Sequence, residues 1–105
     1  MYKIRGKIIS VQNLDINTKK GDFVKKLVTI EETETGFDNQ MQFEIFGQEA
    51  INVIEHDRKL TEGQFVNIDF YIKSREYNTK FYNTLMIKEA RIEDDETQLG
   101  NNPPF

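Results

Sequence analysis

Residues 64–77 read QFVNIDFYIKSREY, and they form the clearest strand pattern in the chain. Apolar side chains occupy every second position through the first part of this stretch, as expected of a strand with one buried face. The alternate side chains should point outward, and they become basic toward the end of the strand, at Lys73 and Arg75. We expect four apolar residues to face a core: Val66, Ile68, Phe70 and Ile72.

The residues after this strand predict a hairpin. Asn78-Thr79 is a signal for a tight turn, and residues 80–92 then return as a fifth strand. The side of this last strand that faces the core stays open at the level of sequence, because Leu85, Met86 and Ile87 are all apolar.

The residues before the hairpin indicate the fold class. Strand patterns cover residues 2–14, 23–33 and 40–46. The helical spacing of Ala50, Ile51 and Ile54 then indicates a helix over residues 48–57. A generic small β-barrel would fit the number of strands, but one helix between the third and fourth of five strands is the layout of an OB-fold. We therefore predict an all-β domain at residues 1–92, a five-stranded OB-fold barrel with one helix between strands 3 and 4.

The composition bounds the class of protein. The chain has 105 residues and no cysteine, so it is large enough for one domain with a modest core, and it has no disulfide or thiolate metal site. No apolar run approaches the length that spans a membrane, and no signal region follows the charged first residues. We therefore expect a cytoplasmic location, in the bacterial cytoplasm or nucleoid, or inside an infected cell if the source is viral.

Charge is segregated along the chain. The formal net charge is −4, yet residues 1–30 and 73–92 each carry an excess of bases, while residues 31–72 carry an excess of acids. If the fold brings the two basic segments together, they form a basic surface that the overall charge conceals. A local field of this kind is what attracts a polyanion.

Rings and cations are interleaved in the same basic segments. Binding of single strands without sequence preference needs cations along the phosphates and flat rings for the bases. Phe46 lies on the polar side of its strand, which is unusual for a core ring. The alternative is that the hairpin rings are cross-strand pairs that stiffen the hairpin. The candidate nucleic-acid-binding residues are Arg5, Lys7, Lys19, Lys20, Phe23, Lys25, Lys26, Phe46, Tyr71, Lys73, Arg75, Tyr77, Lys80, Phe81 and Tyr82.

The C-terminal segment, residues 93–105, differs from the rest of the chain. It begins with four consecutive carboxylates and closes on two prolines and a phenylalanine. It cannot bury enough apolar surface to offset its ordering entropy, so we expect it to be disordered. An acidic leash with an aromatic tip suits capture in a basic-rimmed apolar pocket of another protein, although it also fits a solvated tail without a partner. The candidate partner-binding residues are Glu93, Asp94, Asp95, Glu96, Pro104 and Phe105.

The chain resembles bacterial and phage single-stranded DNA-binding proteins over nearly its whole length. The resemblance rests on Phe46-Gly47, on the hairpin segment Ser74-Arg75-Glu76-Tyr77-Asn78-Thr79-Lys80-Phe81-Tyr82, and on the acidic tail that ends in Pro104-Phe105. It implies a protein that protects single-stranded DNA and recruits replication, recombination or repair proteins through its tail. The chain departs from the family in having no tryptophan, and a polar stretch separates its acidic cluster from the final prolines.

Enzyme signals are weak. His56 is the only histidine, and no Gly-rich phosphate loop is present. Glu31, Glu32 and Glu34 form a charge run without histidine or aspartate at ligand spacing. We therefore expect no enzymatic activity, no cofactor and no metal.

Two classes of function remain. The first is a single-stranded DNA-binding protein, and the second is an OB-fold interaction or oligomerisation module without nucleic-acid binding. The segregated charge favours the first, because a homomeric interface rarely collects so many lysines. The oligomeric state, the preference for DNA over RNA and the partner of the tail stay open.

Overall fold

The computed structural model describes residues 1–33 and 39–93. Of the predicted tail, all except Glu93 lies outside the described residues. The elements in chain order are β1 (Tyr2–Thr18), β2 (Gly21–Glu32), β3 (Gln40–Phe46), α1 (Gln48–Ile54), β4 (Phe65–Tyr77) and β5 (Lys80–Glu93).

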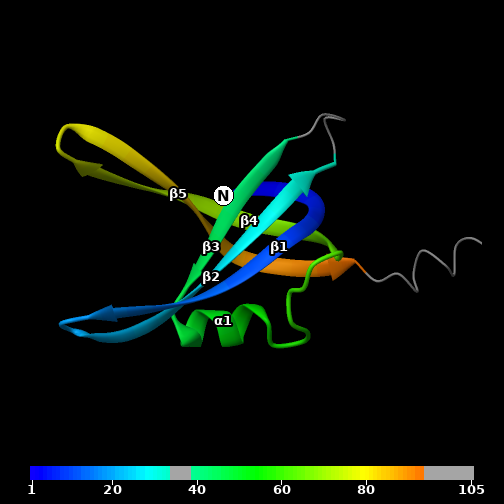
Figure 1. The fold of residues 1–105 in the computed structure, drawn as a ribbon. Coiled ribbons are helices and arrows are strands. Elements are labelled where there is room, and N and C mark those ends of the chain that lie inside the picture. The colour runs from blue at the N-terminus through cyan, green and yellow to red at the C-terminus, as the bar shows by residue number, and fades with distance from the viewer. Residues whose placement is uncertain (34–38, 94–105) are drawn as a thin grey trace, which may run out of the picture.

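The strands form a closed barrel in the order β1-β2-β3-β5-β4 (Figure 1). All neighbouring strands are antiparallel except β3 and β5, which run parallel. One helix lies between β3 and β4 in the chain. This is the OB-fold barrel that the sequence predicts. The strand bounds agree closely with prediction, except that β1 and β2 extend almost to the turn between them.

The core consists of apolar side chains from alternate positions of the strands. Phe43 lies fully buried, with its ring edge-on to Phe70 at a centroid distance of 5.0 Å. The predicted inward positions of β4 are confirmed at Val66, Ile68 and Phe70. Ile72 is 44% exposed instead, because β4 has by then left the barrel and pairs only with β5.

A bulge in β5 explains why its facing could not be predicted. Asp69 pairs with Glu89, but the next residue of β4, Phe70, pairs with Ile87, so Lys88 is an extra residue in β5. A bulge shifts the inward positions by one residue. As a result, Ala90 and Ile92 pack on the core after the bulge, and Leu85 and Ile87 pack on it before the bulge.

Gly6 allows β1 to pair with two neighbouring strands at one position. It pairs with Glu32 of β2 and with Val66 of β4, where β1 crosses between them. A Cβ at this position would lie 2.4 Å from the carbonyl oxygen of Glu31 and 2.5 Å from Cγ2 of Ile30. Only glycine fits this close approach of two backbones.

Helix α1 is joined to the barrel through a buried ion pair. Nζ of Lys26 donates to Oε2 of Glu55 at 2.7 Å, and both side chains are almost fully buried. The same carboxylate oxygen accepts the backbone N–H of Leu60 at 2.7 Å. The helix ends at Ile54, earlier than predicted, and no helix among the described residues is long enough to cross a membrane.

Two long hairpins leave the barrel on the same side (Figure 1). The β1–β2 hairpin turns at residues 19–20, beyond the last pairing of β2 with β3. The β4–β5 hairpin turns at Asn78-Thr79, as predicted, and both residues have positive φ, 51° and 65°. This is the backbone of a two-residue turn matched to the twist of a hairpin.

Candidate nucleic-acid interface

The β4–β5 hairpin carries rings and cations on one face. Residues opposite each other in an antiparallel pair point to the same side, and the register pairs Arg75 with Tyr82 and Tyr77 with Lys80. Alternation along β4 adds Tyr71 and Lys73. We call this set the basic–aromatic face: Tyr71, Lys73, Arg75, Tyr77, Lys80 and Tyr82. All six are exposed, Tyr77 by 64% and Tyr82 by 54%.

The cations of this face have no carboxylate partner within the part of the chain that the structure describes. Among residues 1–33 and 39–93, Lys73, Arg75 and Lys80 form no ion pair with a carboxylate. By contrast, Arg91 is held by Asp69 at 3.2 Å. Cations without an acidic partner keep their field available to an approaching phosphate.

A second group of rings lies on the outer side of β2 and β3. The rings of Phe23 and Phe46 are 5.6 Å apart between centroids, and Phe46 is 44% exposed, in agreement with its predicted outward facing. Lys25 is opposite Phe46 in the register, and its Nζ lies 3.1 Å from Oε1 of Glu44. We call Phe23 and Phe46 the aromatic pair.

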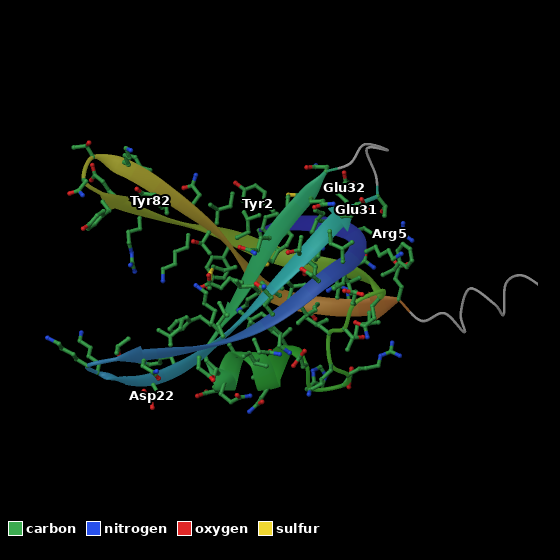
Figure 2. All side chains as sticks on the ribbon, viewed as in Figure 1. Tyr2, Arg5, Asp22, Glu31, Glu32 and Tyr82 are labelled. Carbon is green, nitrogen blue, oxygen red and sulfur yellow. The ribbon has the colours of Figure 1, made fainter. Side chains whose placement is uncertain are left out.

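The aromatic pair and the basic–aromatic face belong to one outer surface. The pairings of Leu27 with Glu44, Glu44 with Met86, and Met86 with Tyr71 form a continuous row across β2, β3, β5 and β4. Figure 2 shows nitrogen-tipped side chains extending from the β4–β5 hairpin toward the β1–β2 hairpin. The two hairpins therefore flank a surface that presents rings from both sides and cations chiefly from one.

Several predicted contacts lie elsewhere. Phe81 is opposite Glu76 and so points to the other face of the β4–β5 hairpin, where it is 69% exposed. Lys26 was predicted to contact nucleic acid, but its buried pair with Glu55 makes it a structural residue. Lys19 and Lys20 are exposed at the tip of the β1–β2 hairpin, which is one of the two hairpins that flank the outer surface.

Arg5 and Lys7 lie on another wall of the barrel, made by β1, β4 and β5. Nη2 of Arg5 donates to Oε1 of Glu93 at 2.8 Å, and Nζ of Lys7 lies 6.0 Å from the centroid of the Phe65 ring. In Figure 2, Arg5 is at the end of the barrel away from the hairpin tips. The structure therefore separates these two cations from the rest of the predicted set.

Glu93, predicted as the first residue of the tail, is the last residue of β5. Its carboxylate accepts hydrogen bonds from Arg5 and from Nδ2 of Asn67 at 2.9 Å. The hydrogen bond from Arg5 is the main reason that the pKa of Glu93 lies below its usual range. Glu93 therefore joins the end of β5 to β1 and β4, and its carboxylate is already engaged within the barrel.

No group of histidine, aspartate and glutamate within the described ranges could hold a metal ion. The remaining outer positions of β3 are polar, with Gln42 exposed and Glu44 half-buried. The outward facing of Glu44 follows from alternation along β3, but its position between two groups of rings does not. That placement comes from the parallel pairing of β3 with β5, which alternation along a single strand does not reveal.

Comparison with known proteins places the chain in a family. Residues 3–93 match the model of a family described as "Domain of unknown function (DUF3127)". The chain belongs to the DUF3127 family. No curated protein matches its sequence.

Solved structures share the fold of this DUF3127 chain at low identity. The dimeric N-terminal domain of PriB protein from Thermoanaerobacter tencongensis is 16% identical with a TM-score of 0.57, covering 89% of this chain and 94% of that one. The small single-stranded DNA-binding protein from Streptomyces coelicolor is 13% identical with a TM-score of 0.51, covering 90% and 93%. At such identity the likeness establishes the OB fold alone.

Proposed function

We propose that this protein binds single-stranded DNA with little sequence preference, in the surface flanked by its two hairpins. The observation that carries the proposal is the basic–aromatic face, on which exposed tyrosines lie among cations that form no ion pair with residues 1–33 and 39–93. Each base stacked on such a ring contributes about 1–3 kcal/mol, and the cations offset the charge of the phosphates. The resemblance to single-stranded DNA-binding proteins and a fold neighbour of that name give independent support.

Quenching of tyrosine fluorescence by oligo(dT) tests this function, because three of the four tyrosines lie on the basic–aromatic face. The logarithm of affinity should fall linearly with the logarithm of salt concentration, with a slope of about −0.7 for each phosphate contact. Duplex DNA should bind poorly, because base pairing hides the faces that the rings need. Equal affinity for a duplex and for oligo(dT) would contradict the stacking mechanism.

The tail adds a second part to the proposal, the recruitment of replication, recombination or repair proteins. The acidic residues and the final Pro104-Phe105 suit a basic-rimmed apolar pocket on another protein. The same negative charge should compete with DNA for the basic–aromatic face. Deleting residues 94–105 should therefore raise the affinity for single strands, most at low salt where screening is least. Deleting Phe105 alone should abolish recruitment and leave the affinity for DNA nearly unchanged.

Self-association is the alternative function, and one observation favours it. The opposite face of the β4–β5 hairpin exposes two large apolar side chains, Ile72 and Phe81. A two-stranded hairpin with both faces in water is only marginally stable, so this face would gain from a partner. Sedimentation of the wild type and of Phe81→Ser, with and without oligo(dT), separates the two functions. An oligomer that forms through Phe81 without any DNA binding would support the alternative.

A further inference from the structure

A polar hollow lies between β3 and β5, and its lining comes from both sides of the sheet: Glu44 and Thr84 belong to the outer side, and Asn83 to the side of Phe81. It forms where β3 and β5 diverge, since these strands pair only from Phe43 to Leu85 and from Glu44 to Met86. Apolar side chains from β2, β3 and β5 line part of it. The remaining lining is made of hydrogen-bonding side chains: Gln42, Glu44, Asn83 and Thr84.

Glu44 lies between the aromatic pair and the tyrosines of the basic–aromatic face. Phe46 is two positions along the same strand, about 7 Å away by the rise of a β-strand. Tyr71 is two strands away in the same row, about 10 Å by the spacing of strands. A nucleotide chain that stacks on rings at both sides must therefore pass over Glu44 and the hollow.

A carboxylate on a surface for a polyanion needs an explanation. It repels phosphates, so a surface that only attracted DNA would carry an amide or a lysine at this position. Oε1 of Glu44 is held by Nζ of Lys25 at 3.1 Å, which fixes the side chain and offsets part of its charge. Within the part of the chain that the structure describes, no donor reaches the other oxygen, Oε2. Glu44 therefore keeps one acceptor oxygen without a donor among the described residues, and its side chain lines the hollow.

We propose that Glu44 reads the Watson–Crick edge of a base placed in the hollow, and that it makes the protein prefer cytosine to thymine. The proposal rests on the proposed function. A carboxylate accepts a hydrogen bond from the exocyclic amino group of cytosine, whereas thymine presents a carbonyl oxygen in the same place and is repelled. Lys25, held beside Glu44, is positioned to contact the neighbouring phosphate. The preference is modest and compatible with binding to any sequence.

Affinities for oligo(dC) and oligo(dT) of equal length test the proposal, measured by titration at neutral pH and at one salt concentration. The wild type should bind oligo(dC) about fivefold more tightly, the effect of one charge-assisted hydrogen bond to a half-buried carboxylate. Glu44→Gln should bind both strands more tightly, because a negative charge is lost and Lys25 is released. Its ratio of the two affinities should fall to near one, because an amide can both donate and accept.

Two control variants and one modified strand separate base reading from charge. Glu31→Gln makes the same change of charge on the outer side of β2 at a residue that does not line the hollow, and it should keep the wild-type ratio. Lys25→Met should weaken binding to both strands, because a cation is lost, and should leave oligo(dC) the tighter ligand, because the carboxylate of Glu44 remains. A strand of 2-pyrimidinone deoxynucleotides, which is oligo(dC) without its amino groups, should bind the wild type no better than oligo(dT).

The outcomes are distinguishable from failure of the proposed function. Equal ratios in the wild type and Glu44→Gln, both proteins remaining folded by circular dichroism, would overturn base reading by Glu44 while leaving DNA binding intact. A wild type that binds the two strands equally would do the same. A wild type that binds neither strand would overturn the proposed function and this inference together.

Discussion

At the scale of single residues, two adjacent lysines have different roles. Lys25 is partly exposed on the outer side of β2, and Lys26 is buried against Glu55. Lys26→Ala should lower the free energy of unfolding by about 3 kcal/mol or more, because it leaves a buried carboxylate without its cation. Lys25→Ala removes a partly exposed pair and should cost about 0–1 kcal/mol. Urea unfolding checks both, and equal losses in the two variants would contradict the assigned burial.

Gly6 is the other residue on which the fold depends directly. Gly6→Ala should destabilise the barrel by about 3 kcal/mol, because the added methyl overlaps a backbone carbonyl that cannot move without breaking the pairing of β1 with β2. Gly21→Ala is the control, since a Cβ there meets no atom within 4 Å and only its positive φ of 137° adds strain. Thermal unfolding should separate the two variants clearly. A Gly6→Ala protein with the melting temperature of the wild type would show that β1 and β2 are not packed as closely at Gly6 as the structure has them.

At the scale of elements, the register of the β4–β5 hairpin assigns neighbouring rings to opposite faces. Tyr82 is opposite Arg75, and Phe81 is opposite Glu76. Tyr82→Ala should weaken binding to oligo(dT) by about 1–3 kcal/mol and leave the salt slope unchanged, because it removes stacking and no counterion release. Phe81→Ala is the matched control and should leave the affinity within about twofold. Larger losses in Phe81→Ala than in Tyr82→Ala, measured by fluorescence titration, would place the interface on the other face.

The elements themselves were largely predictable, because strand periodicity is a local property. The outward facing of Phe46 and the inward facing of Phe43 follow from alternation within β3 alone. The facing of β5 was not predictable, since it depends on a bulge at Lys88 that only the pairing with β4 reveals. Lys26 is a different kind of error. It shares its side of β2 with Val28, so the pattern already pointed inward, but the charge suggested the surface, and Glu55 lies 29 positions away in the sequence.

At the scale of the whole molecule, two ionised carboxylates join neighbouring strands of the barrel through their side chains. Arg5 of β1 and Asn67 of β4 both bind Glu93 at the end of β5, and Arg91 of β5 binds Asp69 of β4. Hydrogen bonds from Arg5 and Arg91 lower the pKa values of Glu93 and Asp69 below their usual 4.5 and 3.8. A carboxyl group with a lower pKa in the folded state contributes stability that is complete above its unfolded pKa.

That stability should be lost as the pH falls below about 4.5 and through the lower pKa values of the folded state. The free energy of unfolding, measured with urea at several pH values from neutral to acidic, should therefore be flat near neutrality and decline at acidic pH. Glu93→Gln should be less stable than the wild type near neutrality. Its free energy of unfolding should also decline less steeply at acidic pH, because only Asp69 of the two carboxyl groups still titrates. Asp57→Gln is a suitable control, since Asp57 is exposed and lies outside the barrel wall. If the stability of Glu93→Gln declined as steeply as that of the wild type, the pair of Arg5 with Glu93 would not contribute to the stability of the barrel.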